Sequence, residues 1–241
     1  MSLEEQPPYS QEDFSRFAWH GWPAASHFFS TSSVTITAPP LCDWWRTPLP
    51  RFINRREGPF LAFEFDGSRN FEAGVWISAA KFDVQYNQGA LLLHAGSMSD
   101  ERSHWMKCGA EYESGHEYVN CVVASPWCDV ATSPSSVPLS ALAPTSGAVW
   151  IQVSLSTTAI GRTLAVRFTL RDQLPADAAV PRAAELTHLR DFPAFGIDDS
   201  GKLTEQAEKG PWHLGLMTAG LADEQGAHAT FTGFRFRYLE E

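Results

Sequence analysis

The sequence has few of the features that mark a secreted or membrane-bound protein. No run of about eighteen apolar residues occurs, so there is no candidate transmembrane helix. The opening residues, MSLEEQPPYSQEDF, are acidic and polar, whereas a signal peptide has a basic start followed by an apolar run. We therefore expect a soluble, cytoplasmic protein with no membrane partner.

Cysteine is scarce, and its spacing indicates neither a disulfide framework nor a metal site. None of the four cysteines (Cys42, Cys108, Cys121 and Cys128) belongs to a CxxC pair, and no Asn-x-Ser/Thr sequon occurs. The motifs typical of serine hydrolases, zinc proteases, dinucleotide-binding proteins and P-loop enzymes are absent as well. The sequence therefore predicts reduced, mostly buried thiols, no metal and no cofactor.

Basic residues are outnumbered by acidic ones. The chain has 18 Lys and Arg against 28 Asp and Glu, which gives a formal net charge of −10. Nucleic-acid binding requires clustered basic side chains that neutralise phosphates, and an acidic surface repels polyanions. We expect no nucleic-acid partner.

Apolar and aromatic residues, in contrast, are abundant and alternate as in β-strands. Hydrophobic residues make up 44% of the chain, with nine Trp and sixteen Phe, which is enough for a large core. Helical potential is modest and confined to residues 175–192, a segment interrupted by prolines. Strands are expected at residues 33–38, 59–67, 71–79, 89–96, 148–156, 163–172, 211–220 and 229–240, and twice within 103–130. This pattern predicts an all-β fold, an antiparallel β-sandwich or jelly roll, as one domain over residues 31–241.

The segments between these strands have distinct compositions. Residues 1–30 are expected to form an N-terminal extension: a mobile part up to residue 16, and the aromatic segment Phe17–Phe29, which covers one edge of the core. Residues 51–58 contain the only local basic cluster, and we expect them to form a solvated loop. Residues 132–146 are rich in Pro, Ser and Ala, which predicts a second loop.

The stretch Ser103–Val130 carries the clearest functional pattern. It is expected to form two strands joined by a polar turn, and its first strand alternates strictly between two faces. One face presents Met106, Cys108, Ala110 and Tyr112, and the other presents Trp105, Lys107, Gly109 and Glu111. The first face fits a core. The second either receives a polar ligand or is an ordinary solvated surface with a charge pattern.

Several pieces of the sequence, in order, carry a resemblance to a known family. They are YNQGALLLHAG (residues 86–96), HWMKCGAEYESG (104–115), VNCVVASPWCDV (119–130), VWIQVSL (149–155) and ATFTGFRF (229–236). Together they resemble the regulation of enolase protein 1 family, also called domain of unknown function 1349. The sequence departs from the family pattern at Asn87, at the exchanged order of Gly89 and Ala90, and at Pro126 and Cys128.

The resemblance implies a fold more directly than a function. It implies a concanavalin A-like sandwich, a class of fold that includes many lectins and glycan-cleaving enzymes, and it implies a link to sugar metabolism. A carbohydrate or small-molecule ligand is therefore the first partner that we expect. A protein partner such as an enolase is a second candidate.

Candidate ligand-binding residues lie on the polar face of the central strand and on elements that could adjoin it. Aromatic rings stack on sugar rings, while charged side chains bond to hydroxyl groups, so this combination suits a carbohydrate. The candidates are Trp105, Lys107, Glu111, His94, Arg167, His213 and Trp127. Gly109 leaves a gap between Lys107 and Glu111 in which a ring could approach the backbone; alternatively, a covering segment such as Phe17–Phe29 fills it.

Binding or regulation is the favoured function, and an enzyme acting on a glycan or small metabolite is the alternative. For a glycosidase or a lyase-type enzyme, Glu111 and Lys107 are the candidate catalytic residues. A glycosidase also needs a second carboxylate about 5–10 Å from the first, for which Glu72 and Asp129 are candidates.

Overall fold

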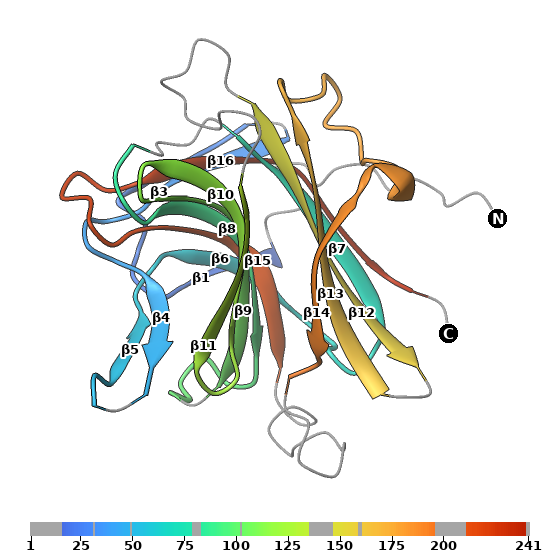
Figure 1. The fold of residues 1–241 in the computed structure, drawn as a ribbon, viewed down its shortest axis with the longest axis horizontal. Helices are drawn as coiled ribbons and strands as arrows, with labels where there is room; N and C mark the ends of the chain where they lie inside the picture. Colours follow the sequence, from blue (N-terminus) through green and yellow to red (C-terminus); the bar gives the residue numbers. More distant parts are fainter. Residues whose placement is uncertain are drawn as a thin grey trace.

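The chain folds into a sandwich of two seven-stranded antiparallel sheets, A and B, as seen in a computed structural model (Figure 1). The structure describes residues 16–30, 32–48, 50–78, 83–101, 103–134, 147–158, 161–195 and 211–239. The expected mobile start and most of the expected loop 132–146 lie outside these ranges. Within them, no helix is both long and apolar enough to cross a membrane.

Sheet A contains the strand on which the functional prediction rests. Its spatial order is β1 (Ala18–His20), β6 (Phe60–Phe65), β15 (Trp212–Gly220), β8 (Asn87–Ala95), β9 (His104–Glu113), β10 (His116–Ala124) and β11 (Cys128–Pro134). The expected two-stranded stretch 103–130 therefore spans β9, β10 and the start of β11. β9 lies between β8 and β10, so the central position predicted for this strand is confirmed.

Sheet B packs against one face of sheet A. Its order is β14 (Thr187–Pro193), β13 (Gly161–Arg171), β12 (Ala148–Thr158), β7 (Phe71–Ser78), β16 (His228–Tyr238), β3 (Ser33–Thr37) and β2 (Ser26–Phe29). The aromatic segment that we expected at one edge of the core supplies an edge strand to each sheet, β1 to sheet A and β2 to sheet B. Its Phe17, Trp19 and Phe29 pack against the core.

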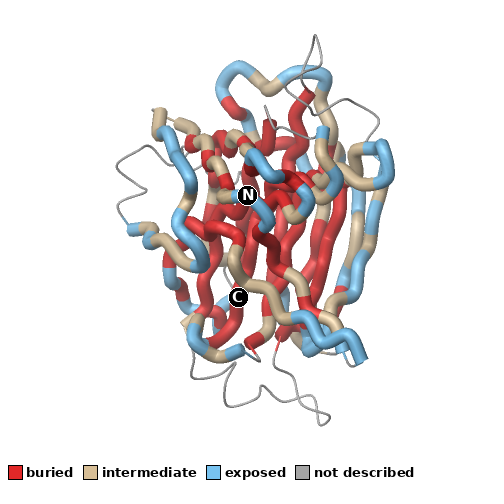
Figure 2. The backbone as a smooth tube through the Cα atoms, turned by 90° about the vertical axis from the view of Figure 1, so that its left-hand side faces the viewer, coloured by how far each residue is buried: buried red, intermediate tan, exposed pale blue. Residues whose placement is uncertain are grey.

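The core between the sheets is formed by one side-chain face of each, as the alternation predicted. From β9 it takes Met106, Cys108 and Ala110, which are at most 1% exposed, with Tyr112 packed against them at the rim. In Figure 2 the buried residues form continuous lengths of the central strands, and the exposed residues lie mainly in the connections and edge strands. The thiols of Cys42, Cys108 and Cys121 are buried and that of Cys128 is partly buried; all four are free, as predicted.

A two-stranded hairpin covers the other face of sheet A. It consists of β4 (Trp44–Thr47) and β5 (Ile53–Arg56), and in Figure 1 it lies on the side of sheet A away from sheet B. The prediction of a solvated loop at residues 51–58 was therefore wrong for β5. The apolar side chains of Cys42, just before the hairpin, and of Trp44, its first residue, pack against the sheet.

The segment with helical potential forms almost no helix. Residues 175–192 contain a single three-residue 3₁₀ turn, η2 (Ala183–Glu185), followed by the edge strand β14. Pro175 and Pro181 lack a backbone donor and restrict the residue before them, which explains why a longer helix does not form. β11 continues to Pro134, into the first residues of the expected loop 132–146.

Candidate functional site

The outer face of sheet A, turned away from sheet B, carries the polar residues singled out in the sequence. Alternation along β9 predicted that this face carries Trp105, Lys107 and Glu111. The packing agrees: Trp105 belongs to the apolar cluster beneath the hairpin, whereas Met106 and Cys108 belong to the core between the sheets. Antiparallel pairing places Gln88 of β8 beside Glu111 and His94 of β8 beside Trp105. The polar residues of this face therefore lie in two adjacent rows, one along β8 and one along β9.

The hairpin closes the middle of this face to solvent. Trp105 is fully buried in a second apolar cluster that includes Trp44, Phe60 and Met217, and Lys107 is 1% exposed. The alternative of a solvated surface is therefore wrong at these two positions, and the face is covered, which we expected only as the alternative explanation of Gly109. The cover is the β4–β5 hairpin rather than the segment Phe17–Phe29.

Lys107 has a partner within the protein. Its Nζ atom lies 2.8 Å from Oδ1 of Asp43, in the segment that leads into β4, and both side chains are almost completely buried. The same oxygen accepts hydrogen bonds from Gln88 Nε2 at 3.0 Å and from the Trp44 backbone N–H at 2.7 Å. A buried ion pair is tolerated when further hydrogen bonds satisfy its carboxylate, as they do at Asp43. Lys107 therefore links sheet A to the segment that leads into the hairpin.

Glu111 lies further along β9, where the hairpin covers the sheet less completely, and is partly exposed. Burial raises the pKa of its carboxyl to about 7, and the Lys107 ammonium opposes that rise. Asn120 of β10 donates a hydrogen bond from Nδ2 to Glu111 Oε2. A carboxyl group with a pKa near neutrality can give or take a proton at physiological pH.

Gly109 is required by the packing of the sheet itself. A Cβ atom at this position would lie 2.1 Å from the carbonyl oxygen of Gly89 and 2.6 Å from Cα of Ala90, both on β8. The gap that we predicted for a sugar ring is therefore occupied by the backbone of the neighbouring strand. The close approach of β8, rather than an approaching ligand, explains the glycine.

His94 lies at the opposite end of the outer face, in a network with the hairpin. Its Nε2 atom is 3.0 Å from Arg56 Nη2 and 2.7 Å from Ser103 Oγ. Burial, with a smaller contribution from the Arg56 charge, lowers the pKa of His94 to about 2, so the ring is neutral. Since a guanidinium group can only donate, Nε2 accepts and the ring proton is on Nδ1.

A cavity of about 280 Å³, the hairpin pocket, opens beside this network. Its lining includes His20, Trp44, Arg56, Ser99 and Glu101. The second predicted histidine, His213, lies directly behind this wall, with its ring centroid 5.1 Å from that of His20 and 6.1 Å from that of His94. The structure therefore brings together His94 and His213, which were separate candidates in the sequence, and adds His20.

The histidines do not make a metal site. No group of three or more His, Cys, Asp or Glu side chains in the described ranges is arranged to hold a metal ion. Burial lowers the pKa of both His20 and His213, which favours neutral imidazoles. Neutral imidazoles beside a guanidinium and an indole suit hydrogen bonding to an uncharged polar ligand.

Two predicted binding residues lie elsewhere. Arg167 is on β13 of sheet B, where its Nη1 atom is 3.5 Å from Ser154 Oγ, so it cannot join a site on sheet A. Trp127 is 42% exposed in the turn between β10 and β11, and its ring contacts Phe52 at the tip of the hairpin.

Neither predicted second carboxylate shares the outer face of sheet A with Glu111. Glu72 is on β7 of sheet B, bonded to Arg237, and Asp129 forms an ion pair with Arg190 of β14. Two other carboxylates do neighbour Glu111 and help to raise its pKa: Asp43, which pairs with Lys107, and Glu113, two residues further along β9.

Sequence reasoning missed the hairpin residues of the site. Asp43 and Trp44 precede the segment 51–58 that we expected to be a loop, and Arg56 lies within it. Nothing in the alternation of these residues indicates which sheet face they cover. The only hint in the sequence was the basic cluster that includes Arg56. A guanidinium group that becomes buried beneath a hairpin needs hydrogen-bond acceptors around it. Arg56 finds them in the backbone carbonyls of Met98 and Asp100.

The two stacked seven-stranded sheets, with a polar site on the outer face of one, define a protein of the concanavalin A-like sandwich class. Within this class, the chain belongs to the family described as protein of unknown function (DUF1349), which matches residues 19–238. The family membership expected from the sequence is confirmed at this level. No curated protein sequence matches the chain.

Solved structures support the fold. A functionally unknown protein from Saccharomyces cerevisiae is similar with a TM-score of 0.66 and 18% identity, covering 95% of this chain and 99% of that one. A bifunctional GH43-CE protein of Bacteroides eggerthii and the GH43 BlXynB protein of Bacillus licheniformis are similar with TM-scores of 0.51 at 10% and 12% identity. This chain covers only 21% and 32% of those two proteins, and 87% and 85% of it is matched. At these identities the likeness concerns the fold alone.

Proposed function

We propose that this protein binds a small neutral carbohydrate, or a metabolite of similar polarity, in the hairpin pocket. The observation that carries the proposal is the composition of the wall: an indole, a guanidinium, an imidazole, a hydroxyl and a carboxylate surround one cavity of about 280 Å³. The Trp44 indole is completely buried under the Arg56 guanidinium, so a ligand would meet mainly the polar groups of the wall. Several hydrogen-bonding groups that converge on one small cavity suit a polar, uncharged ligand.

The wall is held in place before a ligand arrives. The Trp44 indole donates from Nε1 to the Gly58 carbonyl at 2.8 Å, and the Arg56 guanidinium lies over the Trp44 ring, 5.3 Å from its centroid. Arg56 also donates to two backbone carbonyls, of Met98 and Asp100. A site that is already ordered loses less entropy on binding.

The experiment is a calorimetric titration of glucose, galactose, mannose and xylose and their β-linked disaccharides. Ser99 is exposed and lines the pocket, so Ser99→Phe should fill it and abolish binding. Ser26→Phe is the matched control, since Ser26 is exposed on β2 of sheet B. Failure of every sugar to bind, or binding that Ser99→Phe leaves unchanged, would contradict the proposal.

The raised pKa of Glu111 favours a second candidate function, catalysis by a general acid. With a pKa of about 7, this carboxyl could protonate a leaving group at neutral pH. Release of nitrophenol from aryl glycosides would test this function, because Glu111→Gln keeps the shape of the side chain but cannot exchange a proton. If the wild-type protein releases no nitrophenol, this second candidate is excluded for these glycosides.

The wider role implied by the resemblance stays a prediction. Regulation of sugar metabolism, a contact with an enolase and a cytoplasmic location are consistent with a small-ligand sensor. They have no independent support from the geometry of the site.

A further inference from the structure

Two large aromatic side chains are exposed side by side at the tip of the hairpin. Phe52, just before β5, is 55% exposed, and Trp127, in the turn between β10 and β11, is 42% exposed. Their ring centroids lie 6.3 Å apart with the ring planes at 86°, so the two rings meet edge to face. Apolar side chains that cluster on a surface mark binding sites more often than isolated ones do. We call these two residues the aromatic pair.

The turn that carries Trp127 is anchored on both sides. The Pro126 carbonyl accepts a hydrogen bond from Arg46 Nη1 at 3.3 Å, and the Ser125 backbone N–H donates to the Trp127 carbonyl at 3.3 Å. On the other side, the Arg46 backbone N–H lies 3.1 Å from Sγ of Cys128. The backbone before and after the exposed indole is therefore fixed, and a surface that is already ordered loses less entropy when it binds a ligand.

Arg46 also connects this turn to the rim of the hairpin pocket. Its side chain is buried, and Nη2 donates at 2.6 Å to the carbonyl of Glu101, a residue of the pocket lining. Nη1 of the same group donates to Pro126, next to Trp127. A single guanidinium group therefore separates the rim of the pocket from the turn that carries Trp127.

One face of β5 leads from the pocket to the aromatic pair. Arg56 lines the pocket, and Asn54, two residues earlier, turns to the same side, since its Nδ2 lies 3.4 Å from the Glu101 carbonyl. Phe52 precedes Asn54 by two further residues. At about 3.3 Å per residue, the distance along the chain from Arg56 to Phe52 is about 13 Å. A ligand longer than the pocket could therefore reach Phe52 along this face.

The pocket itself is small and has no accessible aromatic face. Its volume of about 280 Å³ lies just below the range of about 300–1,000 Å³ that is usual for small-molecule sites, and its Trp44 indole is completely buried. Aromatic rings offer an apolar face on which a sugar ring can stack, and the aromatic pair exposes such faces near the pocket. Hydrogen bonding and stacking are thus divided between two neighbouring parts of one surface.

We propose that this surface binds a linear, uncharged oligosaccharide of three or more units, with one terminal unit in the hairpin pocket and a later unit stacked on Trp127 or Phe52. The inference rests on the proposed function, because it takes the neutral-sugar site in the pocket as one end of a longer site. The continuity of the two parts identifies the occupant: a polar pocket, with an aromatic platform about 13 Å further along the same face, suits a chain of sugar rings.

The test compares sugars of increasing length. Calorimetric titrations use the mono-, di-, tri- and tetrasaccharides of the β-1,4-linked glucose, xylose and mannose series. In at least one series, we expect the affinity to rise at least tenfold from the disaccharide to the tetrasaccharide, because only the longer chain reaches the aromatic pair. The tetrasaccharide should also shift the Trp127 indole N–H signal in a ¹H–¹⁵N spectrum, and the monosaccharide should not.

Variants of the aromatic pair show whether it causes this gain. Trp127→Ala and Phe52→Ala should each lower the ratio of tetrasaccharide affinity to disaccharide affinity from at least tenfold to below about threefold. Phe28→Ala is the matched control, since Phe28 is 69% exposed on β2 of sheet B, and it should keep the wild-type ratio. If Trp127→Ala does not fold, Phe52→Ala decides the matter.

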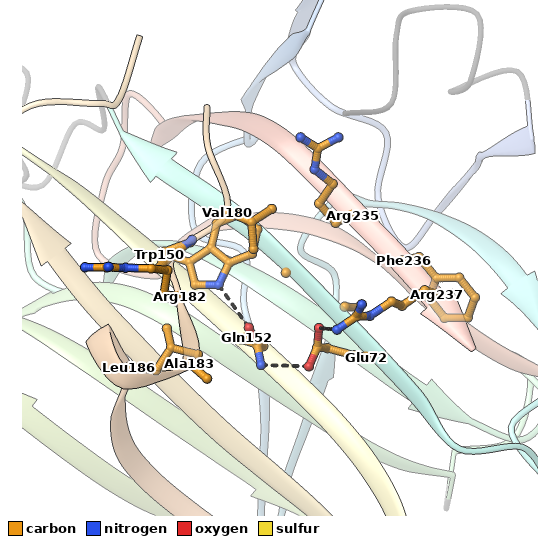
Figure 3. Close-up of a pocket in the computed structure, with 13 residues that line it drawn as sticks. Glu72, Trp150, Gln152, Val180, Arg182, Ala183, Leu186, Arg235, Phe236 and Arg237 are labelled. Atoms are coloured by element: carbon orange, nitrogen blue, oxygen red, sulfur yellow. Dashed lines mark hydrogen bonds and ion pairs between the residues drawn. The ribbon is translucent and has the colours of Figure 1, made fainter. Parts of the chain in front are cut away.

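The Trp150 indole provides an internal control in the same spectra. It lies at a cavity of about 400 Å³ on the outer face of sheet B, where hydrogen bonds join the side chains of Trp150, Gln152, Glu72 and Arg237 (Figure 3). Trp150 is 1% exposed and belongs to the sheet that the hairpin does not cover. We therefore expect none of these sugars to shift its signal.

Three outcomes would overturn the proposal. They are an affinity that does not rise with chain length, a rise that Trp127→Ala and Phe52→Ala leave unchanged, and a dimer in sedimentation that both variants dissociate while chain length has no effect. The last outcome would assign the aromatic pair to contact with a second copy of the chain. In all three cases, a monosaccharide whose binding Ser99→Phe abolishes would still support the proposed function, whereas failure of every sugar to bind would contradict both.

Discussion

Lys107 and Asp43 form a buried ion pair, 2.8 Å apart, that joins the central strand of sheet A to the hairpin above it. The lysine that looked like a ligand-binding residue in the sequence is thus used inside the protein. It fixes the hairpin whose Trp44 and Arg56 line the proposed sugar site.

Removing one member of this pair should be costly. Lys107→Met leaves the Asp43 carboxylate buried without its cation, and we expect a loss of about 3–5 kcal/mol in the free energy of unfolding, measured by urea denaturation. The double variant Lys107→Met/Asp43→Asn should recover a large part of that loss, because it leaves no unpaired charge. Equal losses in the single and double variants would argue against the ion pair.

Glu111 should make the protein less stable as the pH rises from about 4.5 to 7. Its pKa in the folded chain, about 7, lies above the ordinary value of 4.5, so the folded chain holds a proton that the unfolded chain releases in this window. The slope is at most about 1.4 kcal/mol per pH unit. Glu111→Gln should flatten this part of the profile, measured by denaturation at several pH values. Identical profiles for the variant and the wild type would disprove the raised pKa.

His94 should act in the opposite direction at lower pH. Because burial lowers its pKa to about 2, the unfolded chain takes up a proton below about pH 6.5 that the folded chain does not, and stability falls as the pH falls from there. In NMR spectra, the ring resonances of His94 should stay constant between pH 5 and 8. A titration with a midpoint near 6 would show that the ring is not buried as described.

Substitution of Gly109 should destabilise the sheet. A Cβ atom would lie 2.1 Å from the Gly89 carbonyl oxygen, so β8 and β9 would have to separate. We expect Gly109→Val to lower the free energy of unfolding by at least about 1–3 kcal/mol. A Gly109→Val variant as stable as the wild type would show that this face has more room than the packing indicates.

The four thiols give a simple chemical check. All four should be titrated after denaturation without a reductant, since none is in a disulfide. In the native protein Cys108 should be unreactive, because complete burial raises the pKa of its thiol well above the usual value. Recovery of only two thiols after denaturation would indicate a disulfide bond.

The fold was largely predictable from the sequence, because its central strands alternate strictly and face assignment follows from alternation. Met106 and Trp105 were placed on opposite faces correctly for this reason. Segments whose position depends on tertiary contacts were not predictable. β5 was expected to be a solvated loop, yet Arg56 lies partly buried among acceptors supplied by residues 98–100, more than forty positions away in the chain.

The site was predictable only in part. His94 and His213 were chosen as separate candidates, and the adjacency of β8 and β15 brings them together. Arg167 was misplaced because alternation gives the face of a strand but not the sheet to which it belongs. Trp105 and Lys107 were expected to face a ligand, since their pattern does not reveal that a hairpin covers them.

The most direct test of the account is a pair of indole N–H signals, those of Trp44 and Trp150, observed while the neutral sugars are titrated. Trp44 lines the hairpin pocket, and Trp150 lies on β12 of the other sheet. We expect a neutral sugar to shift the Trp44 signal in a saturable way, Ser99→Phe to abolish this shift, and the Trp150 signal to stay in place. A sugar that shifts Trp150 and leaves Trp44 unchanged, or a full panel that shifts neither, would contradict it.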